Sequence, residues 1–210
     1  HKAYSSIENT DIKIKYPNKV IIKNKEYEIT TKLIGSHFIS NIAGAIALAN
    51  QNGITTEDAL EAIRTFPGVK RRTEYLGSRK GIAVYDDYGH HPTEIKATIS
   101  ALKEHSIGNL YVVFQPHRYS RTLNNFNEFK KALTISDHTV VVDIYPAGEE
   151  PIPGVSSKNF ESNNIKYLKS MRMVPSYLSL IVKKNDTILT LGAGDITLLG
   201  PQILKYLDEE

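Results

Sequence analysis

The sequence contains no cysteine among its 210 residues. This absence excludes disulfide bonds, zinc sites built on thiolates and thiol nucleophiles, and it fits a reducing compartment. Long hydrophobic runs are also missing, because the longest apolar stretches, 42–49 and 178–182, fall far short of the roughly 20 residues that a membrane span requires. No signal-peptide pattern opens the chain. We therefore expect a cytoplasmic protein with no membrane as partner.

A large excess of charge of one sign is absent as well. The 26 Lys and Arg residues against 23 Asp and Glu residues give a net charge of +3. Because no basic stripe or tail stands out, nucleic acid is not expected as a partner. With 40% hydrophobic and 23% charged residues, the chain has the composition of a globular protein, and its length allows one domain plus a fragment or two small domains.

Residues 12–68 predict a small sheet followed by two helices. From 12 to 34, β-branched residues, Lys and Tyr alternate roughly and are interrupted by turn-forming residues at 17–18 and 23–25, which is typical of short antiparallel strands. Apolar residues at helical spacing from 42 to 49 predict a first helix that ends at Asn52 and Gly53. Thr55 and Asp58 resemble a capping box at the start of a second helix, which Pro67 and Gly68 end.

Beyond a boundary near Lys70, short apolar strands alternate with helical patterns. The predicted strands are 82–85, 110–114, 139–144 and 187–191. The helical patterns rest on Ile95, Ile99 and Leu102, on Leu123, Phe126, Phe129 and Leu133, and on Leu199, Ile203 and Tyr206. Continuous apolar strands indicate burial on both faces, so we expect an α/β fold with a mostly parallel sheet covered by helices, preceded by the small antiparallel sheet. Ligands of such sheets bind beyond the carboxyl ends of the strands.

The first candidate site segment, 86–94, reads DDYGHHPTE and follows the strand 82–85. Carboxylates there can accept ribose hydroxyls, and imidazoles can bind phosphate or move protons. Thr93 can cap the next helix, whose N-terminus attracts anions. The alternative is that Asp86 and Thr93 form only a turn and a cap, with His90 and His91 merely exposed. The concentration of such residues at a strand end favours function.

The second segment, 115–122, reads QPHRYSRT and follows the strand 110–114. Arg118 and Arg121 lie three residues apart beside His117 and form a fork suited to a carboxylate or a phosphate. The alternative is a solvated basic helix start. That alternative is weak, because cations at a helix N-terminus oppose the macrodipole and require a compensating anion.

Weaker signals lie elsewhere. The segment 192–195, GAGD, can bring backbone close to a ligand, but a strand-to-helix turn needs glycine for its own geometry, and Asp195 can simply cap the helix. Arg71 and Arg72 either reach a phosphate or form a charged hinge. The chain has no Gly-x-x-x-x-Gly-Lys-Ser/Thr phosphate loop, no Gly-x-Ser-x-Gly elbow and no His-Glu-x-x-His metal helix.

Two alternative functions stay open at this point. One is a nucleotide- or phosphate-binding module without chemistry of its own. The other is a metal hydrolase using Asp86, Asp87, His90 and His91, which is disfavoured because adjacent residues rarely chelate one ion; no metal ligand is therefore assigned.

Taken together, the segments 86–95 and 114–122 resemble those of the Mur ligase family. The resemblance includes GSHFISN at 35–41, FPGVKRR at 66–72, YPAGE at 145–149 and GAGDI at 192–196, and it extends over about 37–207. It implies that residues 1–70 are the tail of a central ATP-binding domain and that 71–210 are a Rossmann-like C-terminal domain. The N-terminal and central domains, with the phosphate loop and the magnesium ligands, would lie upstream of His1, which is not an initiator Met.

The resemblance also implies an activity, which is the joining of L-alanine to UDP-N-acetylmuramate with ATP and magnesium, through an acyl phosphate, in peptidoglycan precursor synthesis. A related ligase that recycles a tripeptide onto the same sugar nucleotide shares much of the pattern. The implied catalytic residues are His90, Arg118 and Arg121; the implied nucleotide contacts are Asn41, Arg72 and Asp87; the implied substrate contacts are Tyr88 and His117. Phe38 departs from the family's usual Asn and puts a secondary adenine contact in doubt. By itself, the chain is expected to be inactive.

Overall fold

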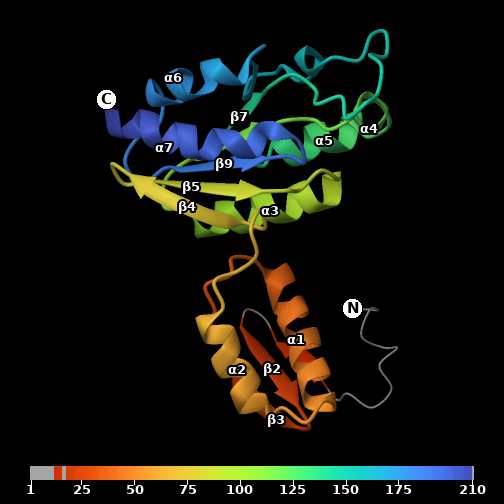
Figure 1. Ribbon diagram of the computed structural model, residues 1–210, viewed down its shortest axis with the longest axis vertical. Coiled ribbons are helices and arrows are strands. Elements are labelled where there is room, and N and C mark those ends of the chain that lie inside the picture. The colour runs from red at the N-terminus through yellow and green to blue at the C-terminus, as the bar shows by residue number, and fades with distance from the viewer. Residues whose placement is uncertain (1–11, 16–17, 210) are drawn as a thin grey trace. The chain divides into compact units, whose positions relative to one another are not determined.

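The computed structural model describes residues 12–15 and 18–209, and the chain divides after Gly68 into two units (Figure 1). Within the described residues, no helix is both long and apolar enough to cross a membrane.

The first unit contains a three-stranded antiparallel sheet and two helices. Its elements are β1 (Ile12–Lys15), β2 (Lys19–Ile22), β3 (Lys25–Glu28), α1 (Ser36–Gln51) and α2 (Thr56–Thr65), and the strand order is β1-β2-β3. Lys23 and Asn24 both adopt positive φ, as a two-residue hairpin between twisted strands requires. The predicted start of the second helix is confirmed, because the Thr55 side chain accepts a hydrogen bond from the Asp58 backbone N–H.

The second unit contains a six-stranded sheet in the order β4-β5-β9-β6-β7-β8. The strands are β4 (Glu74–Arg79), β5 (Ile82–Asp87), β6 (Leu110–Phe114), β7 (His138–Val141), β8 (Ile165–Tyr167) and β9 (Thr187–Leu191). Only β4 runs antiparallel to its neighbour; the other pairs are parallel. The predicted fold class, a mostly parallel sheet covered by helices and preceded by a small antiparallel sheet, is confirmed.

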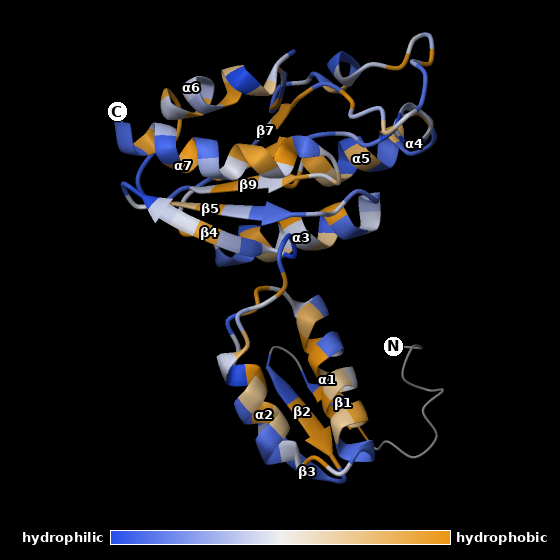
Figure 2. Cartoon of the chain, in the orientation of Figure 1, coloured by the Kyte–Doolittle hydropathy of each residue, from blue (hydrophilic) through white to orange (hydrophobic). Residues whose placement is uncertain are grey.

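Helices cover both faces of this sheet. They are α3 (Pro92–His105), α4 (Tyr119–Asn124), α5 (Phe126–Leu133), α6 (Val174–Ser179) and α7 (Leu199–Glu209), with 3-10 turns at Ser157–Phe160, Met171–Met173 and Asp195–Leu198. Helix α3 packs on α5 and α6 packs on α7, and Figure 1 shows α3 and α7 on opposite faces. Figure 2 shows hydrophobic and hydrophilic residues alternating along α7, as expected of a helix with one buried face.

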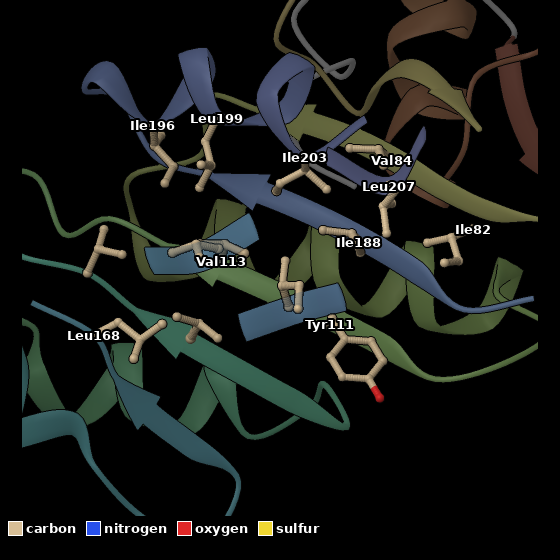
Figure 3. Close-up of a cluster of buried hydrophobic side chains, with 14 residues drawn as sticks. Ile82, Val84, Tyr111, Val113, Leu168, Ile188, Ile196, Leu199, Ile203 and Leu207 are labelled. Carbon is tan, nitrogen blue, oxygen red and sulfur yellow. The ribbon is translucent and has the colours of Figure 1, made fainter. Parts of the chain in front are cut away.

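The core beneath α6 and α7 is a continuous apolar cluster (Figure 3). Val84, Val113 and Ile188 from three neighbouring strands are fully buried against Ile196 and Leu199. Burying each such side chain stabilises the fold by roughly 1.5–3 kcal/mol. This packing holds the carboxyl ends of β5, β9 and β6 in register, because Asp87 and Phe114 both pair with Leu191.

The structure differs from the predicted elements in five places. It adds the edge strands β4 and β8, ends β7 at Val141 rather than at 144, and breaks the helical pattern 123–133 at Asn125. It also extends β5 through Asp87, so the two aspartates close the strand instead of following it.

Candidate active site at the carboxyl edge of the sheet

Asp86 and Asp87 end β5 and are both almost completely buried. Successive strand residues point to opposite faces, so the two carboxylates enter different surroundings. Asp86 accepts hydrogen bonds from the hydroxyls of Thr190 at 2.6 Å and Thr197 at 2.9 Å. Its Oδ2 also lies 3.4 Å from Nε of Arg71. The Asp86 side chain therefore ties β5 to β9 and to the turn after it.

Asp87 holds the turn that leads out of β5. Its Oδ2 accepts from the Thr73 backbone N–H at 2.7 Å, and its Oδ1 accepts from the Gly89 N–H at 2.7 Å. Burial raises the pKa of this carboxyl, and the hydrogen bonds and the nearby Arg72 oppose that rise. Most of the lone pairs of Asp87 are thus already used by the protein.

The start of α3 corrects one expectation from the sequence. The N-cap is His91, whose Nδ1 accepts from the Thr93 N–H at 3.4 Å, and Glu94 completes the capping box. Thr93 was expected to be the cap but lies in the first turn instead, because Pro92 occupies the first helical position, where its missing N–H costs nothing.

The second segment begins the short helix α4, where Arg118 adopts a positive φ of 72°. Ser120 donates to the Glu149 carboxylate through its backbone N–H at 2.9 Å and its hydroxyl at 2.6 Å. The anion required beside the two arginines is therefore supplied at least in part by the chain itself. The Arg118 side chain is exposed.

The two segments meet at two imidazole rings. The ring centroids of His90 and His117 are 6.2 Å apart, and the Tyr145 ring stacks on His117 at 5.5 Å. Arg121 donates from Nη1 to Nδ1 of His117 at 3.2 Å. Burial lowers the pKa of His117, and the positive charges of Arg121 and Arg118 and the neighbouring His90 lower it further. These causes favour the neutral form of the His117 ring.

Tyr88 extends this cluster toward β9. Its ring meets His90 edge-on at 5.2 Å, and the guanidinium of Arg71 lies 4.8 Å from the ring centroid. The same guanidinium donates from Nη2 to the Gly192 carbonyl at 2.6 Å. Sequence reasoning left Arg71 between a phosphate ligand and a hinge charge, and it missed this contact because a backbone carbonyl leaves no signal in the sequence.

The glycines of the segment 192–195 are required by packing. A Cβ on Gly194 would lie 2.4 Å from Oε1 of Gln115, and one on Gly192 would lie 2.7 Å from the Gln115 carbonyl. Asp195 does not cap the following turn with its side chain; it accepts from Nε2 of Gln115 at 2.7 Å. These contacts fix the segment against the end of β6.

A hollow of about 400 Å³ opens beside this segment. Its lining includes Gln115, Asp143, Tyr145, Arg172 and Asp195. It lies beyond the carboxyl ends of β6 and β7, where ligands of open parallel sheets bind.

The remaining residues named from the sequence belong to both units. Arg72 is exposed in the second unit, and Asn41 is exposed on α1 of the first unit. The four residues of the hydrolase alternative do not form one ligand set, since the side chains of Asp86, Asp87, His90 and His91 each bond a different group. No group of three or more His, Asp or Glu able to hold a metal ion occurs in residues 12–15 and 18–209.

A mostly parallel sheet with titratable and cationic side chains gathered beyond its carboxyl edge is typical of a ligand-binding α/β domain. Residues 71–194 match the family model described as Mur ligase, glutamate ligase domain, and the chain belongs to the Mur ligase family.

Individual relatives agree with this assignment. The UDP-N-acetylmuramate–L-alanine ligase of Geotalea daltonii is 42% identical over 189 residues, which cover 87% of this chain and 41% of the relative. The solved UDP-N-acetylmuramate-alanine ligase of Thermotoga maritima superposes with a TM-score of 0.73 at 29% identity, over 91% of this chain and 43% of that one. A murein peptide ligase of Psychrobacter arcticus, at 22% identity and a TM-score of 0.62 over 95% and 44% of the two chains, shares the fold. The chain spans about 40% of the length of the curated relatives it matches.

Proposed function

We propose that the protein acts in an ATP-dependent ligase that joins L-alanine to UDP-N-acetylmuramate in peptidoglycan precursor synthesis. ATP transfers its γ-phosphoryl group to the muramoyl carboxylate and leaves as ADP. The amine of L-alanine then attacks the acyl phosphate, and the amide forms as inorganic phosphate and a proton are released. The observation that carries the proposal is the meeting of the segments 86–94 and 114–122 at one sheet edge in a chain whose relatives bear this name.

Residues 1–70 would be the end of the central ATP-binding domain, and 71–210 would be the C-terminal domain that closes over the nucleotide. Positioning and charge neutralisation supply most of the catalysis in such a reaction. Magnesium, when bound with ATP, neutralises phosphate charge; no residue of this chain is assigned to it, and the N-terminal and central domains of the same protein would complete the site.

The reacting carboxylate and phosphate would meet His90, Arg118 and Arg121. The exposed guanidinium of Arg118 can bind an anion bidentately. Arg121 already donates one hydrogen bond to His117. Its other guanidinium N–H groups would bind the reacting carboxylate or phosphate. Tyr88 and His117 would line the same place.

The nucleotide would contact Asn41 through adenine, Arg72 through phosphate and Asp87 through ribose. Exposure of Asn41 and Arg72 supports the first two roles. Asp87 is only 3% exposed, so the ribose role requires the turn at Thr73 or Gly89 to move when the nucleotide binds.

Incubating this chain with UDP-N-acetylmuramate, L-alanine, ATP and magnesium tests the assignment of domains. We expect no ADP release above background, because the phosphate loop is absent from the sequence. Robust ADP release would overturn the assignment.

A phosphate- or nucleotide-binding module without catalysis is the second candidate, favoured by the exposed Arg118 and Arg72. It predicts that calorimetry detects weak ATP binding and that Arg118→Met weakens this binding further. It also predicts that the native-length protein forms no amide.

A further inference from the structure

The hydrogen-bond partners of the His90 and His117 imidazoles determine which nitrogen of each ring carries the proton. A neutral imidazole carries one proton, so one ring nitrogen donates and the other accepts, and the partner of either nitrogen decides which. In both rings the identifiable partners lie at Nδ1, and the groups near His90 are of the opposite kind to the group near His117.

The partners of His90 only accept hydrogen bonds. Its Nδ1 lies 3.2 Å from the Tyr88 carbonyl oxygen and 3.7 Å from Oε2 of Glu94. Because neither oxygen can donate, Nδ1 must carry the proton. In the neutral ring, Nε2 of His90 is then a bare acceptor.

The partner of His117 only donates. Arg121 Nη1 lies 3.2 Å from Nδ1 of His117, and a guanidinium has no acceptor. Nδ1 of His117 must therefore be bare, and the proton of the neutral ring is on Nε2. The half-buried ring, stacked on Tyr145, is held in this orientation.

We infer that His90 and His117 are held in opposite neutral tautomers, so that neighbouring rings offer one acceptor and one donor Nε2 to a ligand. Such a pair matches a substrate that presents a donor beside an acceptor, as an attacking amine beside an acyl phosphate oxygen does; this use of the pair rests on the proposed function. Arg121 is the positioning residue for the His117 tautomer.

Arg71 is the positioning residue for the His90 tautomer and acts through Tyr88. Its guanidinium lies over the Tyr88 ring and is anchored on the Gly192 carbonyl, and its own carbonyl accepts from the Tyr88 N–H at 2.8 Å. The contact with the Tyr88 ring and the backbone hydrogen bond both hold the backbone that presents the Tyr88 carbonyl to His90, and the Arg71 side chain supplies the first of the two.

Long-range proton–nitrogen NMR spectra of the histidine rings test this inference in the 210-residue chain. They are recorded near pH 8, above the ordinary histidine pKa of about 6.5. We expect His90 to show a protonated Nδ1 and a bare Nε2, and His117 to show the reverse. The same tautomer in both rings would overturn the inference, and this measurement on the unaltered chain decides it whether or not the variants fold.

Three matched substitutions then separate positioning from general stability. Arg121→Met should convert His117 to a mixture of tautomers and leave His90 unchanged, whereas Arg71→Met should do the opposite. Arg79→Met removes an exposed guanidinium that also bonds a carboxylate and a carbonyl, and it should change neither ring. An unchanged His117 in folded Arg121→Met, or an unchanged His90 in folded Arg71→Met, would refute the corresponding positioning role. Because no turnover is needed, failure of the ligase proposal would leave these results interpretable.

Discussion

Replacing Gly194 by alanine tests whether the turn after β9 is fixed by the end of β6. The added Cβ would lie 2.4 Å from Oε1 of Gln115 and 2.7 Å from Cγ of Tyr145. Backbone strain is not involved, because φ of Gly194 is −88°. The methyl group must therefore displace a side chain that is already bonded, since Oε1 of Gln115 accepts from the Ile196 N–H at 3.1 Å.

The expected cost combines overpacking and a weakened hydrogen bond. Overpacking costs about 1–3 kcal/mol, and a hydrogen bond contributes about 1 kcal/mol. We expect Gly194→Ala to lower the free energy of unfolding by about 2–4 kcal/mol, measured by urea unfolding followed by circular dichroism. Movement of Tyr145 should also disturb the His117 ring that stacks on it.

Two controls make the Gly194 result specific. Gly154→Ala meets nothing within 4 Å but has a φ of 82°, so it should pay only backbone strain of about 1 kcal/mol and leave His117 unchanged. Gln115→Ala removes the nearest atom, so the double variant should lose less stability than the sum of the single variants. A Gly194→Ala protein within about 0.5 kcal/mol of the parent, or strict additivity in the double variant, would refute the reasoning.

Three further predictions concern titration and binding. Because the pKa of His117 is lowered from its ordinary 6.5, the unfolded chain binds this proton first as the pH falls below that value. As the pH falls from 6.5, His117→Gln should therefore lose less stability than the parent protein, measured as the urea midpoint. Identical pH profiles of the midpoint in the two proteins would contradict this. Asp87→Ala should lose about 2–3 kcal/mol of stability, because buried N–H groups lose their acceptor. It should also weaken ATP binding in calorimetry more than Asp87→Asn does. Equal effects of the two substitutions on ATP binding would refute the hydrogen-bonding role of Asp87. A hydrogen bond to Asp143 at 2.5 Å raises the pKa of Tyr167 to about 12; Asp143→Asn should return the NMR-detected titration toward 10, and an unmoved titration would exclude that bond as the cause.

The buried strands could be predicted because their signal is local. Short runs of apolar and β-branched residues give β6 and β9 with the expected ends, and every residue of both strands is buried, as expected of strands covered on both faces. The edge strands were missed for the converse reason. β4 has no buried residue and β8 has only three residues, so their existence depends on pairing with β5 and β7 rather than on their own composition.

The candidate site shows the same division between local and long-range information. Strand-end clusters could be placed at one edge of the sheet because parallel strands bring their carboxyl ends together. The partner of each nitrogen could not be predicted, because Arg71 bonds the Gly192 carbonyl 121 residues away and His90 bonds a backbone oxygen. Glu149 stands in the motif at 145–149, but the hydrogen bond that it accepts from Ser120, 29 residues away, could not be predicted from that motif.

Amide formation by the protein at its native cellular length tests the central claim most directly. The purified protein would be given UDP-N-acetylmuramate, ATP and magnesium with L-alanine or with the tripeptide, and the sugar-nucleotide products would be identified by mass spectrometry. The ligase account predicts the alanyl product with one ADP released per amide, and loss of that product in Arg118→Met. A folded protein that binds ATP but forms no amide with either amine donor would contradict it and leave the phosphate-binding module; a tripeptide product alone would assign the protein to the recycling reaction instead.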